Sequence, residues 1–291
     1  MSRIDLHLHS TYSDGSFSPH QLLSKASHFQ VTALSLTDHD TTDGISEAVE
    51  AASHLDIEII PGVEVSSSYQ GTETHILGYF IDLQNPLFQD RLRQLRQSRK
   101  DRIPKIVKKL NEIGVPLSHE DILSIAGHGS IGRPHVAQAL VKKHYVSSIE
   151  EAFSQYLKEG AKGYIPRQLP DAQEAIHWIR SAGGVPSLAH PGWVRHSIQE
   201  LKTVCLTLKK YGLQGIEVFH SSHTSRQISE YQTLANRLDL LVTGGSDFHG
   251  KPRPEIEVGI GKGNLNIPGD ILEALRTRAS ENRMAAEETR K

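Results

Sequence analysis

The chain has 291 residues, a length that can bury the core of a single α/β barrel of ordinary size. The formal net charge is -2, so no global field favours a polyanionic partner, and any contact with nucleic acid must come from local charge. One cysteine excludes an intrachain disulfide framework, and we find no signal peptide or bilayer-spanning apolar stretch, which predicts a cytoplasmic protein without a membrane partner.

In chain order, short apolar segments alternate with longer helical patterns, which is typical of βα units. Strands are predicted at residues 4–9, 33–37, 57–61, 74–80, 185–189, 215–219 and 240–243. Helices are predicted at residues 19–27, 43–53, 171–181, 198–211 and 225–238. Because a helix repeatedly follows a strand, we expect a parallel sheet that closes into a barrel.

The alternation stops between residues 84 and 163, where apolar residues recur at helical spacing without a convincing strand. The sequence therefore predicts a helical insertion, interrupted around Pro104, in a discontinuous barrel that covers residues 1–83 and 164–278. Residues 90–112 are rich in arginine and lysine, which fits either a solvated helix face or a surface that attracts phosphate. The polar residues 279–291 predict a frayed helix or a disordered tail.

Histidine is unusually common, with 17 residues in a chain that has only 2 tryptophans and 2 methionines. His7 and His9 lie two positions apart on the first predicted strand, so both imidazoles point to the same face. A lone His-x-His is weak evidence for a metal site, because surface or core placement explains it as well. The case is strengthened by Asp14, in a Ser-Asp-Gly turn, and by His39, which lies among three potential oxygen ligands in Thr-Asp-His-Asp.

Five further residues of ligand type lie beside later strands. They are Glu64 in Pro-Gly-Val-Glu, His75 in Thr-His-Ile-Leu-Gly, His190 in Leu-Ala-His-Pro-Gly, and Asp247 and His249 in Gly-Ser-Asp-Phe-His. Each alone could be a core histidine or a helix-capping carboxylate. Active sites of parallel barrels are assembled at the C-terminal ends of different strands, so side chains far apart in sequence converge there. We therefore expect these nine residues to form one multi-metal site.

These motifs resemble those of the PHP family, named for polymerase and histidinol phosphatase, and they extend from Ile4 to about His249. The resemblance implies a distorted TIM-like (β/α)7 barrel that binds two or three divalent ions. Manganese or zinc is favoured, with iron or magnesium as alternatives. It implies one metal on His7, His9, Glu64 and Asp247, a second on Glu64, His75 and His190, and a third on Asp14, His39 and His249.

Within the family the chain is most similar to nucleoside 3′,5′-bisphosphate phosphatases and to 5′-to-3′ exoribonucleases that act on short RNA. The similarity lies in Ile-Gly-Arg-Pro-His-Val-Ala at residues 131–137 and Gly-Tyr-Ile-Pro at residues 163–166. Arg133 would grip a phosphate that is not cleaved, because a guanidinium matches phosphate oxygens. An ion pair at a helix start also explains this arginine. Further candidates for contact with the substrate are His135, Lys162, His220 and His223.

The resemblance predicts a phosphoesterase in which the metals lower the pKa of a bound water to about 7. The resulting hydroxide would attack phosphorus, with Asp247, His190 and Arg133 as the catalytic candidates. The expected partner is a phosphorylated nucleotide or short RNA, and no obligate protein partner is evident.

Three alternatives stay open: a histidinol-phosphate phosphatase, a catalytically silent PHP module that binds a partner, and a barrel amidohydrolase that acts on C–N bonds. The arginine that would grip a second phosphate argues against the first. The complete ligand set argues against the second. Glu64 at the position of a bridging lysine argues against the third.

Overall fold

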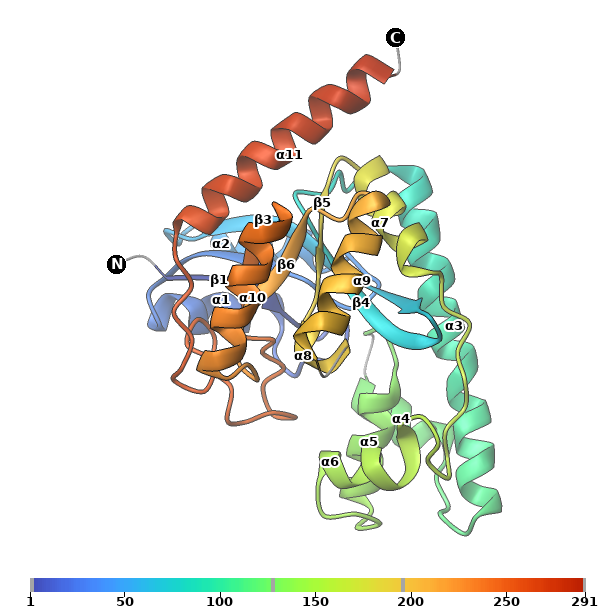
Figure 1. Cartoon of the computed structure of the whole chain (residues 1–291). Coiled ribbons are helices and arrows are strands. Elements are labelled where there is room, and N and C mark those ends of the chain that lie inside the picture. The colour runs from blue at the N-terminus through green and yellow to red at the C-terminus, as the bar shows by residue number, and fades with distance from the viewer. Residues whose placement is uncertain (1–2, 127–128, 195–196, 290–291) are drawn as a thin grey trace.

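The centre of the molecule is a barrel of seven strands (Figure 1). The structure is a computed structural model that describes residues 3–126, 129–194 and 197–289. The strands are β1 (Arg3–Leu8), β2 (Val31–Leu36), β3 (Glu58–Tyr69), β4 (Thr72–Tyr79), β5 (Val185–Leu188), β6 (Gly215–His220) and β7 (Leu241–Gly245), side by side in that order. Main-chain hydrogen bonds from His9 to Phe248 (3.0 Å) and from Asp247 to His7 (2.9 Å) nearly close the barrel between β1 and β7. The predicted fold class is confirmed.

One strand runs against the others. β4 is antiparallel to both β3 and β5, whereas the remaining pairs are parallel. The expectation of an all-parallel sheet is therefore wrong. β3 and β4 form a hairpin with Gln70 and Gly71 in its turn, both with positive φ (51° and 80°), the backbone that a tight two-residue turn requires. Because β4 is reversed, its beginning lies beside the C-terminal ends of the parallel strands.

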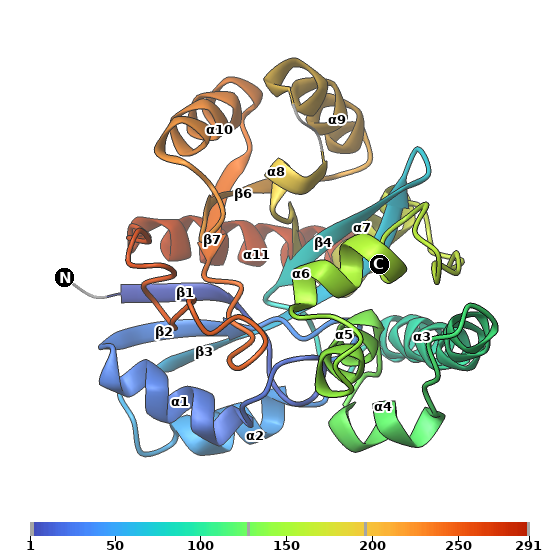
Figure 2. The ribbon, with the colours of Figure 1, turned by 90° about the horizontal axis from the view of Figure 1, so that it is seen from below.

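Helices pack around the outside of the barrel. They are α1 (Pro19–His28), α2 (Ile45–Ala52), α7 (Ala172–Ser181), α9 (Ile198–Lys210) and α10 (Ser225–Leu238), with a short α8 (Pro191–Val194) after β5. The five longer helices match the predicted ranges to within two residues at each end. Figure 2 shows α1 and α2 on one side of the barrel and α9 and α10 on the other. Capping boxes fix the starts of α7, α9 and α10, because side chain and main chain satisfy each other's hydrogen bonds there.

The segment between β4 and α7 is helical and extends away from the barrel (Figure 1). It contains α3 (Pro86–Glu112), α4 (His119–Ala126), α5 (Arg133–Lys142), α6 (Ile149–Ala152) and a π-helical turn, η1 (Phe153–Leu157). The predicted interruption is wrong, because α3 continues through Pro104. Proline removes one main-chain hydrogen bond, but Ile103 and Ile106 are buried beside it in the core of the insertion and hold the helix. The first half of α3 packs instead on the barrel, through Phe88 and Leu92.

The last helix, α11 (Asp270–Thr289), packs across the beginnings of the strands. Leu275 and Ala279 lie in the same core as Ile4 of β1, and the side chain of Asn282 donates a hydrogen bond to the main-chain oxygen of Gly184 (2.9 Å). Residues 279–289 thus continue a regular helix where a frayed helix or a disordered tail was predicted, and residues 290–291 of that prediction lie outside the described residues. Within the described residues, no helix is both long and apolar enough to cross a membrane.

Candidate metal centre

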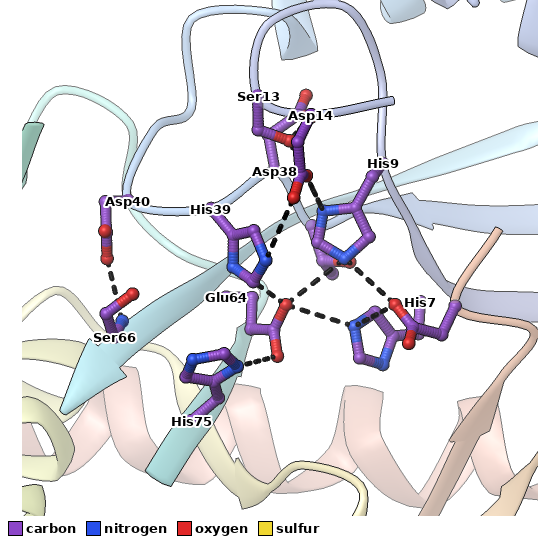
Figure 3. A network of polar contacts seen from close by, with 12 residues as sticks. His7, His9, Ser13, Asp14, Asp38, His39, Asp40, Glu64, Ser66 and His75 are labelled. Carbon is purple, nitrogen blue, oxygen red and sulfur yellow. Dashed lines mark hydrogen bonds and ion pairs between the residues drawn. The ribbon is translucent and has the colours of Figure 1, made fainter. Parts of the chain in front are cut away.

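All nine predicted ligand residues lie together at one end of the barrel, and Figure 3 shows six of them, His7, His9, Asp14, His39, Glu64 and His75. Glu64 lies inside β3, which is longer than predicted, and His75 joins the group because β4 is reversed. Close packing needs glycine at position 245, where a Cβ would lie 2.2 Å from Cβ of His7. The backbones of His190 and Asp247 have positive φ (26° and 56°), a strained conformation that is common at functional sites.

Glu64 is the centre of this cluster and is fully buried. Its Oε1 lies 2.7 Å from Nδ1 of His75 and 2.8 Å from Nε2 of His190. Its Oε2 lies 3.1 Å from Nδ1 of His39 and 3.2 Å from Nε2 of His9. A carboxylate whose two oxygens reach different imidazoles has the geometry of a ligand that two cations share.

Asp14 and Asp247 extend the cluster. One oxygen of Asp14 lies 3.4 Å from Nε2 of His249, and the other lies 3.7 Å from Nε2 of His39. Asp247 places Oδ1 3.2 Å from Nε2 of His9. Three carboxylates and six histidines therefore share one buried space.

The chemistry of these side chains fits metal ions. Ligand atoms lie within 4.8 Å of one another in three groups: His7, His9 and Glu64; His39, Glu64 and His75; and His9, Asp14, His39 and His249. Several of the buried atoms lack any hydrogen-bond partner among the described residues, including Nε2 of His7, His9 and His75, Nδ1 of His39, Oδ1 of Asp14 and Oε2 of Glu64. Such orphaned atoms are rare inside proteins. Cations between them would satisfy them, and mixed imidazole and carboxylate ligands suit divalent transition metals.

Glu217, which sequence reasoning missed, positions two of the ligand residues. Its carboxylate accepts a hydrogen bond from Nδ1–H of His7 (2.8 Å) and another from the main-chain N–H of His190 (2.6 Å). The first bond fixes the tautomer of His7 and leaves Nε2 to face Glu64 and Asp247. A charged residue inside the apolar strand Gly-Ile-Glu-Val-Phe-His is the signal that could have revealed it.

The two other acids of Thr-Asp-His-Asp are directed away from the cluster. Asp38 accepts hydrogen bonds from the main-chain N–H of Ser10 (2.7 Å) and from the hydroxyl of Ser13 (2.5 Å), and so holds the loop that carries Asp14. Asp40 binds two arginines instead. Of this motif, only His39 therefore has its side chain among the ligand atoms.

Carboxylates hold protons on the neighbouring imidazoles when no cation is bound. Burial lowers the pKa of His9, but Asp247 and Glu64 outweigh burial and raise it to about 9. Burial also lowers the pKa of His75, and Glu64 and Glu73 raise it to about 10. A histidine must be neutral to bind a metal. Metal ions that bind here therefore have to displace protons.

We expect metal binding at about pH 7.5 to release protons from the three histidines whose pKa is raised, His7, His9 and His75, and affinity to rise with pH as these groups lose their protons more readily. The measurement is calorimetric titration of metal-stripped protein in two buffers that differ in ionisation enthalpy. Equal heats in the two buffers would show that no net proton leaves, contrary to this expectation.

A cavity of about 340 Å³ opens over the cluster. Ligand residues line it together with five arginines, Arg99, Arg102, Arg133, Arg167 and Arg253. Two of these arginines come from α3, one begins α5 and one lies in the segment before α7. The helical insertion therefore contributes positive side chains to the same space as the metal cluster.

Arg133 lies in this cavity and also forms an ion pair. Its guanidinium lies 2.6 Å from one oxygen of Glu73, whose other oxygen lies 3.7 Å from Nε2 of His75. The arginine side chain keeps 19% of its surface exposed. The ion pair at a helix start and a role in the cavity are therefore compatible.

The other predicted substrate contacts are not among the described residues that line the cavity. His135 is buried, and its Nδ1 accepts a hydrogen bond from the main-chain N–H of Gly132. This bond caps the start of α5. Lys162 is exposed on the segment after η1. His220 lies behind the cluster with Nε2 3.3 Å from Asp247, and His223 is buried with its Nδ1–H bonded to a main-chain oxygen.

Arg253 and Trp193, like Arg167, line the cavity although they were not predicted from the sequence. Arg253 lies 2.6 Å from Oδ2 of Asp247. The ring of Trp193 lies 4.3 Å from the ring of His190, and half of this tryptophan is exposed. Arg253 and Trp193 each follow a ligand motif by three or four residues, after His190 and His249, which is the signal that could have identified them.

A barrel with histidines and carboxylates gathered at the carboxyl ends of its strands defines a metal-dependent hydrolase. The family model of the PHP domain matches residues 5–184. The chain belongs to the PHP family of metal-dependent phosphoesterases.

Relatives of known name extend this assignment over most of the chain. The 5′-3′ exoribonuclease Rnm of Escherichia coli is 35% identical over 257 residues, which cover 88% of this chain and 87% of the relative. The 3′,5′-nucleoside bisphosphate phosphatase of Chromobacterium violaceum is 34% identical over 250 residues, which cover 86% and 88%. A solved Chromobacterium violaceum structure, described as an amidohydrolase with bound sulfate and no metal, is 32% identical with a TM-score of 0.87 and covers 95% of this chain and 97% of that one. The predicted resemblance is confirmed.

Proposed function

We propose that the protein hydrolyses phosphate esters of nucleotides, namely nucleoside 3′,5′-bisphosphates or short 5′-phosphorylated oligoribonucleotides. Both substrates carry another phosphate besides the one that is cleaved. The observation that carries this proposal is that one cavity combines a metal-type cluster with several arginines, so that two phosphates can be bound at once. The names of the phosphatase and exoribonuclease relatives support the same substrate class.

The arginines carry more charge than their protein partners neutralise. Arg99 and Arg167 share a single carboxylate, that of Asp40, and Arg102 has no acidic partner among the described residues. Burial, together with a neighbouring guanidinium, lowers the pKa of Arg102 and of Arg167 to about 10, so both stay charged at neutral pH. Each also has a buried guanidinium nitrogen without a hydrogen-bond partner. A phosphate would satisfy these donors and balance their charge.

The nine clustered residues are the proposed ligands of two or three divalent cations, in the assignment that the family resemblance implies. Manganese or zinc is the proposed metal, because imidazole nitrogen with carboxylate oxygen suits these ions better than magnesium. Bound in this site, the cations would neutralise phosphate oxygens and lower the pKa of a bound water. Among the described residues that line the cavity there is no lysine to bridge two cations, which favours a phosphoesterase over an amidohydrolase.

The chain's own residues set the protonation states that this role needs. Burial raises the pKa of Asp247, but Arg253 and His249 outweigh it and keep the carboxylate ionised. Burial lowers the pKa of His190 below its ordinary value despite the opposing effect of Glu64, so this imidazole is neutral at pH 7. An ionised Asp247 and a neutral His190 are the forms that bind cations.

We also assign the enzyme to the cytoplasm. Cys205 is a free, buried thiol, and burial raises its pKa to about 12, so it is inert. A chain that relies on no disulfide suits a reducing compartment.

The test is turnover by purified protein whose metal content has been measured. Adenosine 3′,5′-bisphosphate, a 5′-phosphorylated hexaribonucleotide and histidinol phosphate are compared with manganese, zinc and no added metal. We expect metal-dependent cleavage of the nucleotide substrates. Cleavage of histidinol phosphate alone would refute the nucleotide assignment, and failure to cleave any ester would favour a non-catalytic binding module.

Replacing Arg133 with alanine should raise KM for adenosine 3′,5′-bisphosphate about 10- to 100-fold with kcat changed much less, since a hydrogen bond to a charged group contributes about 1.5–3 kcal/mol. Steady-state kinetics measure both constants. Arg226→Ala is the matched control, because Arg226 also pairs with a glutamate (2.8 Å) but is 87% exposed on α10. If both variants showed the same kinetics, the only role of Arg133 would be its ion pair with Glu73.

A further inference from the structure

A second opening continues from the cavity over the metal cluster. It has a volume of about 790 Å³ and shares a wall with that cavity, which includes His75 and His190. Beyond this wall it is lined by residues of the β3–β4 hairpin turn (68, 71 and 72) and of the segment at residues 158–169, which leads from η1 to α7. We call the part between these two segments the side groove.

The side groove offers room that a mononucleotide does not need. The cavity over the cluster has about 340 Å³ and on its own falls within the range of small-molecule sites, about 300–1,000 Å³. The additional opening has more than twice that volume and begins at the metal-facing histidines. A substrate that reaches from the metals into the side groove is therefore longer than one nucleotide.

The lining of the groove suits single-stranded nucleic acid. Trp193, at the shared wall, is half exposed and has its ring tilted by 32° against the ring of His190, and Tyr164 adds a second aromatic side chain. Aromatic rings of this kind bind bases by stacking without selecting their sequence. Lys158 is exposed at the groove and forms no ion pair among the described residues, so its ammonium group can meet a backbone phosphate. Gln168 supplies hydrogen-bonding groups for bases and ribose hydroxyls.

We propose that the side groove binds the nucleotide that follows the scissile phosphate in a single-stranded oligoribonucleotide. The proposal rests on the proposed function and makes its substrate more specific. With the scissile phosphate at the metal cluster and the terminal phosphate at the arginines, the remaining chain leaves along the β3–β4 hairpin. Nucleoside bisphosphates do not extend into the groove.

The first test fills the groove by replacing Thr72, at the start of β4, with tryptophan. We expect the ratio of kcat/KM for a 5′-phosphorylated hexaribonucleotide to kcat/KM for adenosine 3′,5′-bisphosphate to fall about tenfold, as expected when one base loses its stacking site. Thr32→Trp places the same residue on an exposed position of β2 and should keep the wild-type ratio. Initial rates of the first cleavage are measured for both substrates.

The second test uses salt, because a purely structural effect would not change the salt dependence of binding. For Lys158→Gln we expect the slope of log KM for the hexaribonucleotide against log salt to decrease by about 0.7, the value for one lost phosphate contact on a single strand. Lys105→Gln, on an exposed face of α3, should keep the wild-type slope.

The outcomes separate this proposal from the proposed function. If the wild-type protein cleaves the bisphosphate and leaves the hexaribonucleotide intact, or if neither Thr72→Trp nor Lys158→Gln differs from its control, the groove assignment is overturned while the phosphoesterase stands. If the metal-loaded protein cleaves neither nucleotide substrate, the proposed function itself fails. A lower ratio in Thr72→Trp together with a smaller salt slope in Lys158→Gln supports the groove.

Discussion

Replacing Glu64 with glutamine will lower kcat/KM for every phosphate ester that the protein cleaves by about 1,000-fold or more, because the charge that holds two cations together is lost. The wild-type carboxylate offers oxygens to imidazoles on both sides, including His75 at 2.7 Å and His39 at 3.1 Å. Glutamine keeps the shape of the side chain, but an NH2 group replaces one of the two carboxylate oxygens. This group donates hydrogen bonds and cannot bind a cation. Mass spectrometry of bound metal should show the loss of at least one ion per chain together with the loss of activity.

Glu58→Gln is the matched control for this variant. Glu58 begins the same strand, β3, but is 42% exposed and pairs with Arg276 at the surface. It should keep its metal content and its kcat/KM, because an exposed ion pair contributes little. Both variants should retain the circular dichroism spectrum of the wild type. A folded Glu64→Gln protein with full metal content and activity would disprove the central position of Glu64.

The residues of the cluster could be predicted because two local signals place them. Alternation along a strand puts His7 and His9 on one face, and parallel strands end at a common edge. Those signals do not depend on knowing which strands are neighbours. They are also insensitive to small errors, since Glu64 joins the cluster although its strand is longer than predicted.

The direction of β4 had no comparable local signal. The residue pattern of an apolar strand is the same whichever way the strand runs. The only clue to the reversal of β4 was the pair Gln70-Gly71, which permits a tight turn. His75 therefore lies in the cluster for a reason that the sequence did not provide, namely the reversal of β4. In an all-parallel barrel the beginning of β4 would lie at the opposite end from the other ligands.

The burial of two arginines of α3 could have been predicted from the helical spacing of the sequence. Arg99 and Arg102 lie four and seven positions after the buried Leu95, so the helical period places them on the apolar face of α3. Charged residues on that face are buried, whereas Arg93 and Lys100 on the opposite face are exposed to solvent. The two faces of α3 therefore differ, because one is solvated and the other places Arg99 and Arg102 at the cavity.

The pairing of Asp40 could not be read from the sequence at all, because its partners lie 59 and 127 positions away. Asp40 is fully buried and holds Arg99 at 2.6 Å and Arg167 at 3.1 Å, while the main-chain N–H of Ser66 donates to its other oxygen (2.7 Å). Burial alone would raise the pKa of Asp40, but the two guanidinium groups outweigh it and hold the pKa far below its ordinary value. One carboxylate thereby fixes two cavity arginines and joins α3 and the segment before α7 to the barrel.

Asp40→Asn should destabilise the protein by about 3–5 kcal/mol at neutral pH, because it leaves two buried guanidinium groups without their counter-charge. Urea unfolding followed by circular dichroism measures the change. Asp43→Asn is the matched control, since Asp43 also faces an arginine of α3, Arg96 at 3.7 Å, but is 54% exposed and should lose less than about 1 kcal/mol.

The pH dependence separates the charge of Asp40 from its packing. A carboxyl whose folded pKa is depressed contributes stability that is fully present above its unfolded pKa of about 3.9 and is lost as the pH falls toward the folded value. The gap between wild type and Asp40→Asn should therefore stay constant from about pH 7 to pH 5 and narrow below about pH 4. A gap that persists unchanged in acid would assign the effect to packing, and a gap no larger than that of Asp43→Asn would show that Asp40 does not anchor the two arginines.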